Sequence, residues 1–158
     1  MARRTEQRRA AVVALYQADV TGRPAPELVE GGASPFTREL VEGVVADRSA
    51  LDESIARHAT GWSLDRIAPL ERNILRVAVH EMRNRSDIPD EVAIDEAVEA
   101  AKELCSADAP AFVNGVLGAV QREPGANGRE PEAGNGGGGA AARERGAGSG
   151  DRSGGEPA

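Results

Sequence analysis

The chain has 158 residues, a net charge of −7, one cysteine and two histidines. This length favours one domain with room for a tail, and a single cysteine excludes both a disulfide framework and a structural zinc site of four cysteines or of two cysteines and two histidines. No run of 18 apolar residues is present, so we expect no membrane span, and no apolar stretch follows the charged start, so we expect a cytoplasmic protein without a secretory signal.

The first helix is expected over residues 3–20. Val12, Tyr16 and Val20 repeat at the four-residue spacing of one helix face. A segment rich in glycine and proline follows over residues 22–34 and predicts a loop.

A second helical stretch is expected from Ser34 to about residue 58. Ser34 is a suitable N-cap, and Pro35 suits the first helical position. The apolar stripe continues through the whole stretch, with a bend expected near Asp47. Residues 63–67 predict a short helix after a turn.

A third long helix is expected over residues 69–84. Its apolar face is broad, which predicts a central position in the fold. The apolar residues of this face are Leu70, Ile74, Leu75, Val77, Ala78 and Met82.

Two further helices complete the predicted domain. Asp90 or Asp95 is expected to cap a helix that ends near Cys105, and Asp108 is a candidate N-cap for the last helix, residues 109–121. No segment shows the alternation of a strand. The sequence therefore predicts an all-α fold, a compact helical bundle.

The composition changes near Glu123. Residues 123–158 include 12 glycines and no large aliphatic or aromatic side chain. Such a segment buries too little apolar surface to offset its ordering entropy, so we expect residues 1–122 to form a helical domain and 123–158 to form a disordered tail.

No catalytic or metal-binding constellation is visible. His80 and Glu81 begin a zinc protease signature, but residue 84 is asparagine, so the second histidine ligand is absent. We expect no enzyme activity, no metal and no cofactor.

Arginines crowd the start of the first predicted helix. Arg3, Arg4, Arg8 and Arg9 face one nearby acid, Glu6. Guanidinium groups donate bidentate hydrogen bonds that suit phosphate, and a helix N-terminus adds positive dipole character. The cluster predicts a phosphate-binding tip, and a frayed, solvated helix end is the alternative. Four neutralised phosphates would give a slope of about −3 for log affinity against log salt.

Several segments, in their order and spacing, closely resemble the NusB family of bacterial transcription antitermination factors. The similarity covers about residues 3–121. The segments are Ala14-Leu15-Tyr16, Leu40-Val41-Glu42-Gly43-Val44, Leu70-Glu71-Arg72-Asn73-Ile74-Leu75-Arg76, Asp87-Ile88-Pro89, Val92-Ala93-Ile94-Asp95-Glu96-Ala97-Val98, Ala101-Lys102 and Phe112-Val113-Asn114-Gly115-Val116-Leu117.

This resemblance implies an all-helical fold of two small subdomains and a function in binding. NusB proteins bind the boxA element of single-stranded leader RNA from ribosomal operons, together with a small-subunit ribosomal protein that acts as NusE. The pair helps to load an antitermination complex on RNA polymerase, and no catalysis or cofactor is involved.

The resemblance also assigns roles to residues of this sequence. The RNA-binding residues implied are Arg4, Arg8, Arg9, Asp108 and Phe112. The partner-binding residues implied are Tyr16, Glu71 and Glu81.

Other interpretations of some residues stay open. Phe112 stacks on an unpaired base or packs in the core, Tyr16 contacts the partner or lies in the core, and Lys102, the only lysine, reaches phosphate or is solvated. Gly115 within a helix predicts a close contact with a neighbouring helix. Alternatives for the whole chain are a module like the N-terminal domain of ribosomal RNA cytosine methyltransferases, or a helical adaptor that binds only protein.

Overall fold

The structure, a computed structural model, describes residues 3–123. Within this range the chain forms six α-helices, two 3₁₀ helices and no strand, which confirms the predicted all-α fold. The elements are α1 (Arg4–Thr21), η1 (Ala25–Leu28), α2 (Pro35–Ala46), α3 (Arg48–His58), η2 (Leu64–Arg66), α4 (Pro69–Asn84), α5 (Asp90–Leu104) and α6 (Ala109–Arg122). The tail predicted over residues 123–158 falls, apart from Glu123, outside the described residues.

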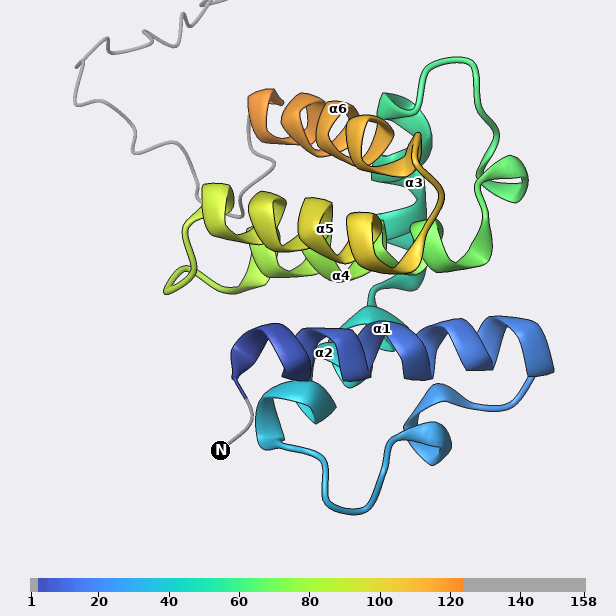
Figure 1. Cartoon of the computed structure of the whole chain (residues 1–158), viewed down its shortest axis with the longest axis vertical. Coiled ribbons are helices and arrows are strands. Elements are labelled where there is room, and N and C mark those ends of the chain that lie inside the picture. Colours follow the sequence, from blue (N-terminus) through green and yellow to red (C-terminus); the bar gives the residue numbers. More distant parts are fainter. Residues whose placement is uncertain (1–2, 124–158) are drawn as a thin grey trace, which may run out of the picture.

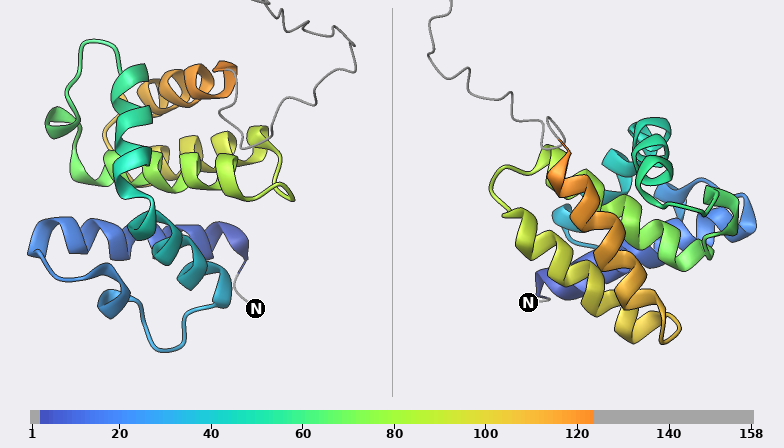
Figure 2. Two further views of the ribbon diagram at one scale, coloured as in Figure 1. Left: turned by 180° about the vertical axis from the view of Figure 1, so that it is seen from behind. Right: turned by 90° about the horizontal axis from the view of Figure 1, so that it is seen from above.

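The helices form two packed groups, which are the lower and upper parts of Figure 1. The lower group contains α1, η1 and α2, and the upper group contains α3, α4, α5 and α6; the two further views in Figure 2 show the same division. Helix α4 packs against α1 and α2 of the lower group and against all three other helices of the upper group. Its central position is the one that its broad apolar face predicts. No helix among residues 3–123 meets the length and hydropathy needed to cross a membrane.

Two predicted helix ends are confirmed by the local geometry. The Ser34 hydroxyl accepts a hydrogen bond from the backbone N–H of Thr37 at 3.1 Å, and Pro35 occupies the first position of α2. Gly22 ends α1 with φ 77°, a left-handed conformation that glycine adopts without steric cost, and its N–H donates to the Ala18 carbonyl.

The helical stretch predicted from Ser34 to about residue 58, with a bend near Asp47, is two separate helices. The break falls at Asp47, whose φ of −106° and ψ of 16° are not helical. The chain passes there from the lower group to the upper group (Figure 2). The apolar stripe continues across the break because α2 and α3 both pack on α4, so the pattern alone did not reveal the separation.

Three smaller predictions also need correction. Neither Asp90 nor Asp95 is the N-cap of α5, because Pro89 occupies that position and α5 begins at Asp90. The loop at 22–34 contains the short helix η1. A methyl group added to Gly115 would meet nothing within 4 Å, so this glycine makes no close helix contact.

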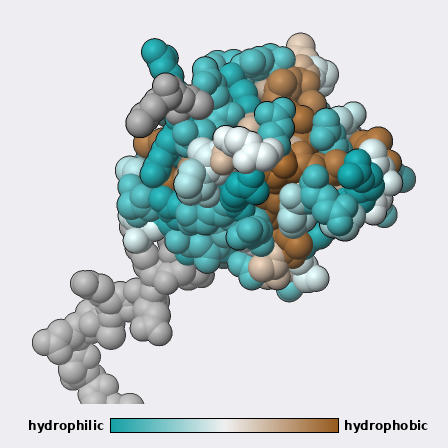
Figure 3. All heavy atoms as spheres, turned by 90° about the horizontal axis from the view of Figure 1, so that it is seen from below, coloured by the Kyte–Doolittle hydropathy of each residue, from teal (hydrophilic) through white to brown (hydrophobic). Residues whose placement is uncertain are grey.

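The underside of the lower group is partly apolar. A groove of about 860 Å³ runs between α1 and the segment that precedes α2, and its apolar lining includes Val13, Leu28 and Val29. Figure 3, which views the molecule from below, shows apolar surface between hydrophilic areas on this side.

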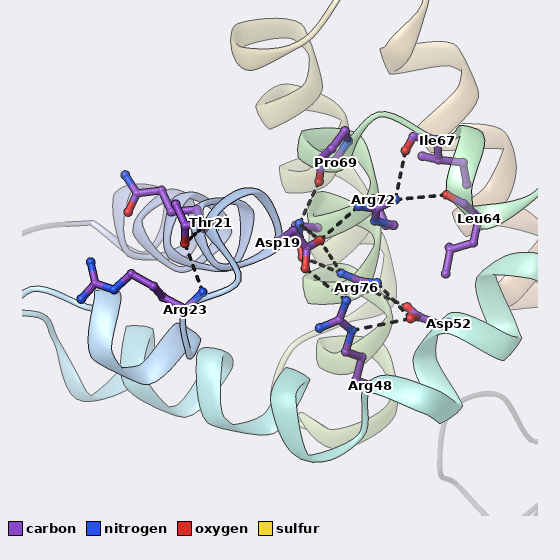
Figure 4. Close-up of polar contacts among 12 residues, drawn as sticks. Asp19, Thr21, Arg23, Arg48, Asp52, Leu64, Ile67, Pro69, Arg72 and Arg76 are labelled. Carbon is purple, nitrogen blue, oxygen red and sulfur yellow. Dashed lines mark hydrogen bonds and ion pairs between the residues drawn. The ribbon is translucent and has the colours of Figure 1, made fainter.

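A buried ionic network joins the C-terminal half of α1 to α3 and α4 (Figure 4). Arg76 donates to Asp19 at 2.9 Å and to both carboxylate oxygens of Asp52 at 2.6 and 2.9 Å. Burial opposes ionisation of Asp19, but the hydrogen bond from Asn73 and the charges of Arg76 and Arg48 outweigh it, so the pKa of Asp19 lies below its ordinary value. The network therefore holds ionised groups in a largely buried position.

Helices α2 and α4 approach closely at Gly43. A methyl group added there would lie 2.2 Å from Cε1 and 2.4 Å from Nε2 of His80. The His80 ring is buried, and the Asn84 side-chain amide lies 3.1 Å from its Nδ1. Burial lowers the pKa of His80 below its ordinary value of 6.5, although the charges of Asp47 and Glu39 oppose this effect.

We predict that Gly43→Ala lowers the free energy of unfolding by about 1–3 kcal/mol, because the new methyl group would overlap the buried His80 ring and force the packing to shift. Urea denaturation measures this change. Gly115→Ala is the matched control, since it adds the same group in open space and should stabilise the fold by about 0.5–1 kcal/mol. Equal effects of the two substitutions would contradict the packing argument.

We predict that stability falls as the pH drops below about 6.5, because His80 has a lower pKa in the folded state and the unfolded chain binds the proton more readily. The contribution is complete above the unfolded pKa, and its slope is at most about 1.4 kcal/mol per pH unit. Urea denaturation between pH 8 and pH 5 of the wild type and of His80→Gln gives the difference, and NMR of the two histidines follows the titration directly. Parallel stability curves for the two proteins would refute this assignment.

Candidate nucleic-acid interface

The N-terminal end of α1 carries two exposed arginines, Arg3 and Arg4. The Arg4 side chain is 50% exposed, lies 4.5 Å above the ring of Phe36, and makes an ion pair with Asp87 at 3.9 Å. Hydrogen bonds from Arg85 lower the pKa of Asp87 to about 2, so this carboxylate is ionised at neutral pH. Exposed pairs of this length contribute little, and a phosphate group can replace Asp87 as the partner of Arg4.

Arg8 is not part of the exposed tip, which corrects the expectation from sequence. Its Nε donates to Oε1 of Glu81 at 2.7 Å, a second nitrogen lies 3.9 Å from Glu96, and only 10% of the side chain is exposed. Little of the Arg8 side chain is therefore open to a phosphate group. The structure assigns Arg8 the role of an internal ion-pair partner.

Glu81 is likewise inside the molecule, although the family resemblance implies a partner contact. Its side chain is 1% exposed, and Oε2 has no hydrogen-bond partner among the described residues. Burial raises the pKa of Glu81 above its ordinary value, and the hydrogen bond from Arg8 opposes this shift. A partner protein cannot touch this carboxylate in the observed arrangement.

Arg9 and Lys102 are paired with glutamates of α5. Arg9 forms an ion pair with Glu103, and 26% of the Arg9 side chain is exposed. Lys102 is exposed and donates to Glu99 at 3.0 Å. The positive charge of the α1 arginines is therefore largely balanced by carboxylates that are distant along the chain, whereas Lys102 is paired within its own helix.

A second group of predicted residues meets at the start of α6. Asp108 and Phe112 line a pocket of about 290 Å³ together with Glu71, the second residue after Pro69 at the start of α4. Asp108 is exposed and occupies the N-cap position of α6, as predicted, but its side chain makes no capping hydrogen bond. Burial raises the pKa of Glu71 above its ordinary value.

The structure adds two residues to this pocket that sequence reasoning did not select. Trp62 contacts Phe112 edge to face, with ring centroids 6.0 Å apart, and Arg66 lies beside it. Trp62 is the only tryptophan and follows a glycine in a predicted turn, and this was the one feature of the sequence that could have pointed to it.

Tyr16, the remaining predicted residue, is half-buried on α1.

The two groups of residues lie in different parts of the molecule. The arginines occupy the N-terminal half of α1 next to α4 and α5, and the pocket lies where η2 and α4 meet the start of α6. Within residues 3–123 no cluster of three or more histidine, cysteine or acidic side chains is arranged to hold a metal. The available chemistry is ionic, aromatic and hydrogen-bonding.

The chain is similar in sequence to proteins of a known family. The model of the NusB family matches residues 5–122. A protein of Frankia casuarinae called Transcription antitermination protein NusB is 58% identical over 87 residues, which cover 55% of this chain and 64% of that protein. The protein of the same name from Saccharopolyspora erythraea is 45% identical over 129 residues, which cover 76% of this chain and 87% of that protein. The chain thus matches slightly less than two thirds of the Frankia protein's length.

Solved structures show the same arrangement of helices. NusB of T. maritima superposes with a TM-score of 0.72 at 31% identity, over 77% of this chain and 92% of that chain. A chain in a crystal structure of the antitermination factors NusB and NusE in complex with dsRNA superposes with a TM-score of 0.66 at 28% identity, over 73% of this chain and 93% of that one.

We predict opposite roles for two neighbouring arginines in a stability measurement. Arg8→Ala should lower the free energy of unfolding by about 3–5 kcal/mol because it leaves Glu81 buried without its cation, whereas Arg4→Ala should change it by less than about 1 kcal/mol. Urea denaturation of both variants measures the difference. The double variant Arg8→Met/Glu81→Leu removes both charges and should recover most of the loss, and a failure of Arg8→Ala to destabilise would contradict the internal role.

Proposed function

Because the chain belongs to the NusB family, we propose that it is a transcription antitermination protein. In this proposal it binds boxA RNA of ribosomal operon transcripts together with the small-subunit ribosomal protein that acts as NusE, and it acts in the cytoplasm. It helps to assemble the antitermination complex on RNA polymerase. It works by binding alone, without catalysis or a cofactor.

One observation carries most of this proposal. The described fold superposes on a chain of the NusB–NusE–dsRNA complex over 93% of that chain's length, so nearly all of that chain has a counterpart here. The family match over residues 5–122 supports the same conclusion.

The geometry supports RNA binding by a subset of the arginines. Arg3 and Arg4 are exposed, and Arg9 needs only to leave the surface carboxylate of Glu103, which is 54% exposed. Such surface pairs are weak, so phosphates compete with them effectively. Arg8 contributes by fixing α1 on α4, which positions the arginines around it. The expected footprint of these arginines is therefore two or three phosphates, and the affinity of the chain alone is modest.

The remaining predicted residues keep separate roles in the proposal. Phe112 and Asp108 border the bases, and Lys102 adds a cation on α5. Tyr16 and Glu71 are the proposed contacts with the ribosomal protein, because each retains some exposure. The buried Glu81 supports that surface from inside.

The proposal is tested by titrating labelled boxA RNA with the protein, with and without the ribosomal partner, and comparing a scrambled RNA. Specific binding that strengthens with the partner supports the proposal. Binding of the partner with no RNA in the complex would instead indicate an adaptor that binds only protein, and absence of both interactions would reject the proposal.

We predict that Arg4→Ala weakens boxA RNA binding about five-fold, the equivalent of ~1 kcal/mol for one charge-assisted contact. The arginines of α1 should contribute about −1.4 to −2 to the wild-type slope of log affinity against log salt, since they contact two or three phosphates, and Arg4→Ala should reduce the magnitude of the slope by about 0.7. Fluorescence anisotropy at several salt concentrations measures both values. Arg57→Ala is the matched control, because Arg57 is also exposed and paired with a surface glutamate but lies on α3 in the other group of helices. An equal effect of the two substitutions would show that only net charge matters.

A further inference from the structure

The pocket at the start of α6 has the composition of a site for a flat, partly polar ligand. Its lining includes the buried side chains of Ile67 and Ala109, each 2% exposed, and the aromatic rings of Trp62 and Phe112. Arg66, Glu71, Ser106 and Asp108 add polar groups to the lining. The volume of about 290 Å³ is at the lower end of ligand pockets and suits one ring system.

The backbone of Trp62 is fixed by a hydrogen bond, whereas its side chain is left largely open to a ligand. Its backbone N–H donates to the Ala59 carbonyl at 2.9 Å, and the preceding Gly61 has a φ of 83°, so the turn fixes where the side chain emerges. The residue is nevertheless 51% exposed. Its indole N–H has no partner in the part of the chain that the structure describes. One face and one donor of the indole are thus available to a ligand.

Arg66 is an unpaired cation at the same place. Its backbone N–H donates to the Ser63 carbonyl in η2, which fixes the residue, but its guanidinium makes no ion pair or side-chain hydrogen bond with any residue from 3 to 123. Arg4 and Arg9 near the start of α1 have carboxylate partners, as does the largely buried Arg8. A free guanidinium beside an exposed indole favours a ligand that joins an aromatic ring to an anion.

An unpaired nucleotide has this combination of groups. Proteins hold single-stranded RNA by stacking its bases on aromatic side chains and by placing arginine on the adjoining phosphate. The carboxylate of Asp108 accepts hydrogen bonds only, which suits the amino and imino donors on a base edge and repels a phosphate. The base therefore belongs inside the pocket and the phosphate beside Arg66.

We propose that Trp62 and Arg66 are RNA-binding residues, and that the pocket they form with Phe112 takes one unpaired base of the bound RNA. This inference rests on the proposed RNA-binding function and extends it to a base-binding site away from the α1 arginines. The base stacks on the exposed face of Trp62, and Arg66 binds the neighbouring phosphate.

The single tryptophan allows a direct test. Titration of the full chain with single-stranded boxA RNA should quench the emission of Trp62 in a saturable way. A series of RNAs in which one nucleotide at a time is replaced by an abasic sugar keeps every phosphate. One position in that series should lose most of the quenching, and this position identifies the stacked base.

Variants then separate stacking from charge. Trp62→Ala should weaken RNA binding roughly ten-fold and leave the salt slope unchanged, while Trp62→Phe retains most of the affinity. Arg66→Ala should reduce the magnitude of the salt slope by about 0.7. Trp62→Ala should also bind the critical abasic RNA as well as the intact RNA, because both partners of the stack are then missing. Val92→Ala is the control, since Val92 is an apolar side chain of α5 with 42% exposure and should not alter affinity.

The outcomes distinguish this inference from the function on which it rests. RNA binding with unchanged Trp62 emission and normal affinity of Trp62→Ala would overturn the pocket assignment and leave the proposed function intact. Weaker binding of the ribosomal partner by Trp62→Ala in the absence of RNA would overturn it in favour of a protein contact. No binding of boxA RNA by the wild type, with or without the partner, would remove both proposals.

Discussion

The position of α1 on α4 depends on two buried ion pairs, one toward each end of α1. Arg8 pairs with Glu81, and Asp19 pairs with Arg76. A buried charge without its partner is costly, so α1 cannot slide along α4 without leaving a carboxylate or a guanidinium uncompensated. Hydrophobic contacts alone allow several registers of two packed helices, and these pairs select one. The exposed Arg3 and Arg4 consequently have a fixed position relative to α5.

The same arrangement explains which parts of the fold were predictable from the sequence. Helix boundaries depend on residues next to one another in the chain, and the signals at Ser34, Pro35 and Gly22 were sufficient for α1 and α2. Only a bend near Asp47 was predicted where α2 separates from α3, because both helices present apolar residues to the same partner and their stripes join across that residue. The close packing at Gly43 was also not predicted, since it depends on His80, which lies on a different helix.

The contacts of the candidate site were harder to predict from the sequence than the helix boundaries. A dense group of arginines in the sequence predicts a positive tip, but the carboxylates that balance it lie on α4 and α5, and Arg8 and Glu81 are separated by 73 positions. Spacing along one helix does not reveal such partners. At the pocket near Phe112, the sequence pointed to Asp108, Glu71 and Phe112 but not to Trp62 and Arg66. These two residues come from a turn and from η2, and they reach the pocket only in the folded chain.

The long separation between Arg8 and Glu81 has a consequence for biosynthesis. The ribosome adds roughly 5–20 residues per second, so the 73 positions between the two residues correspond to about 4–15 s of translation. During that interval α1 has emerged without α4, and Arg8 and Asp19 are hydrated instead of buried. The nascent N-terminal segment can collapse onto α2 but cannot reach its final state. Native assembly of this half of the molecule therefore requires that α4 has been synthesised.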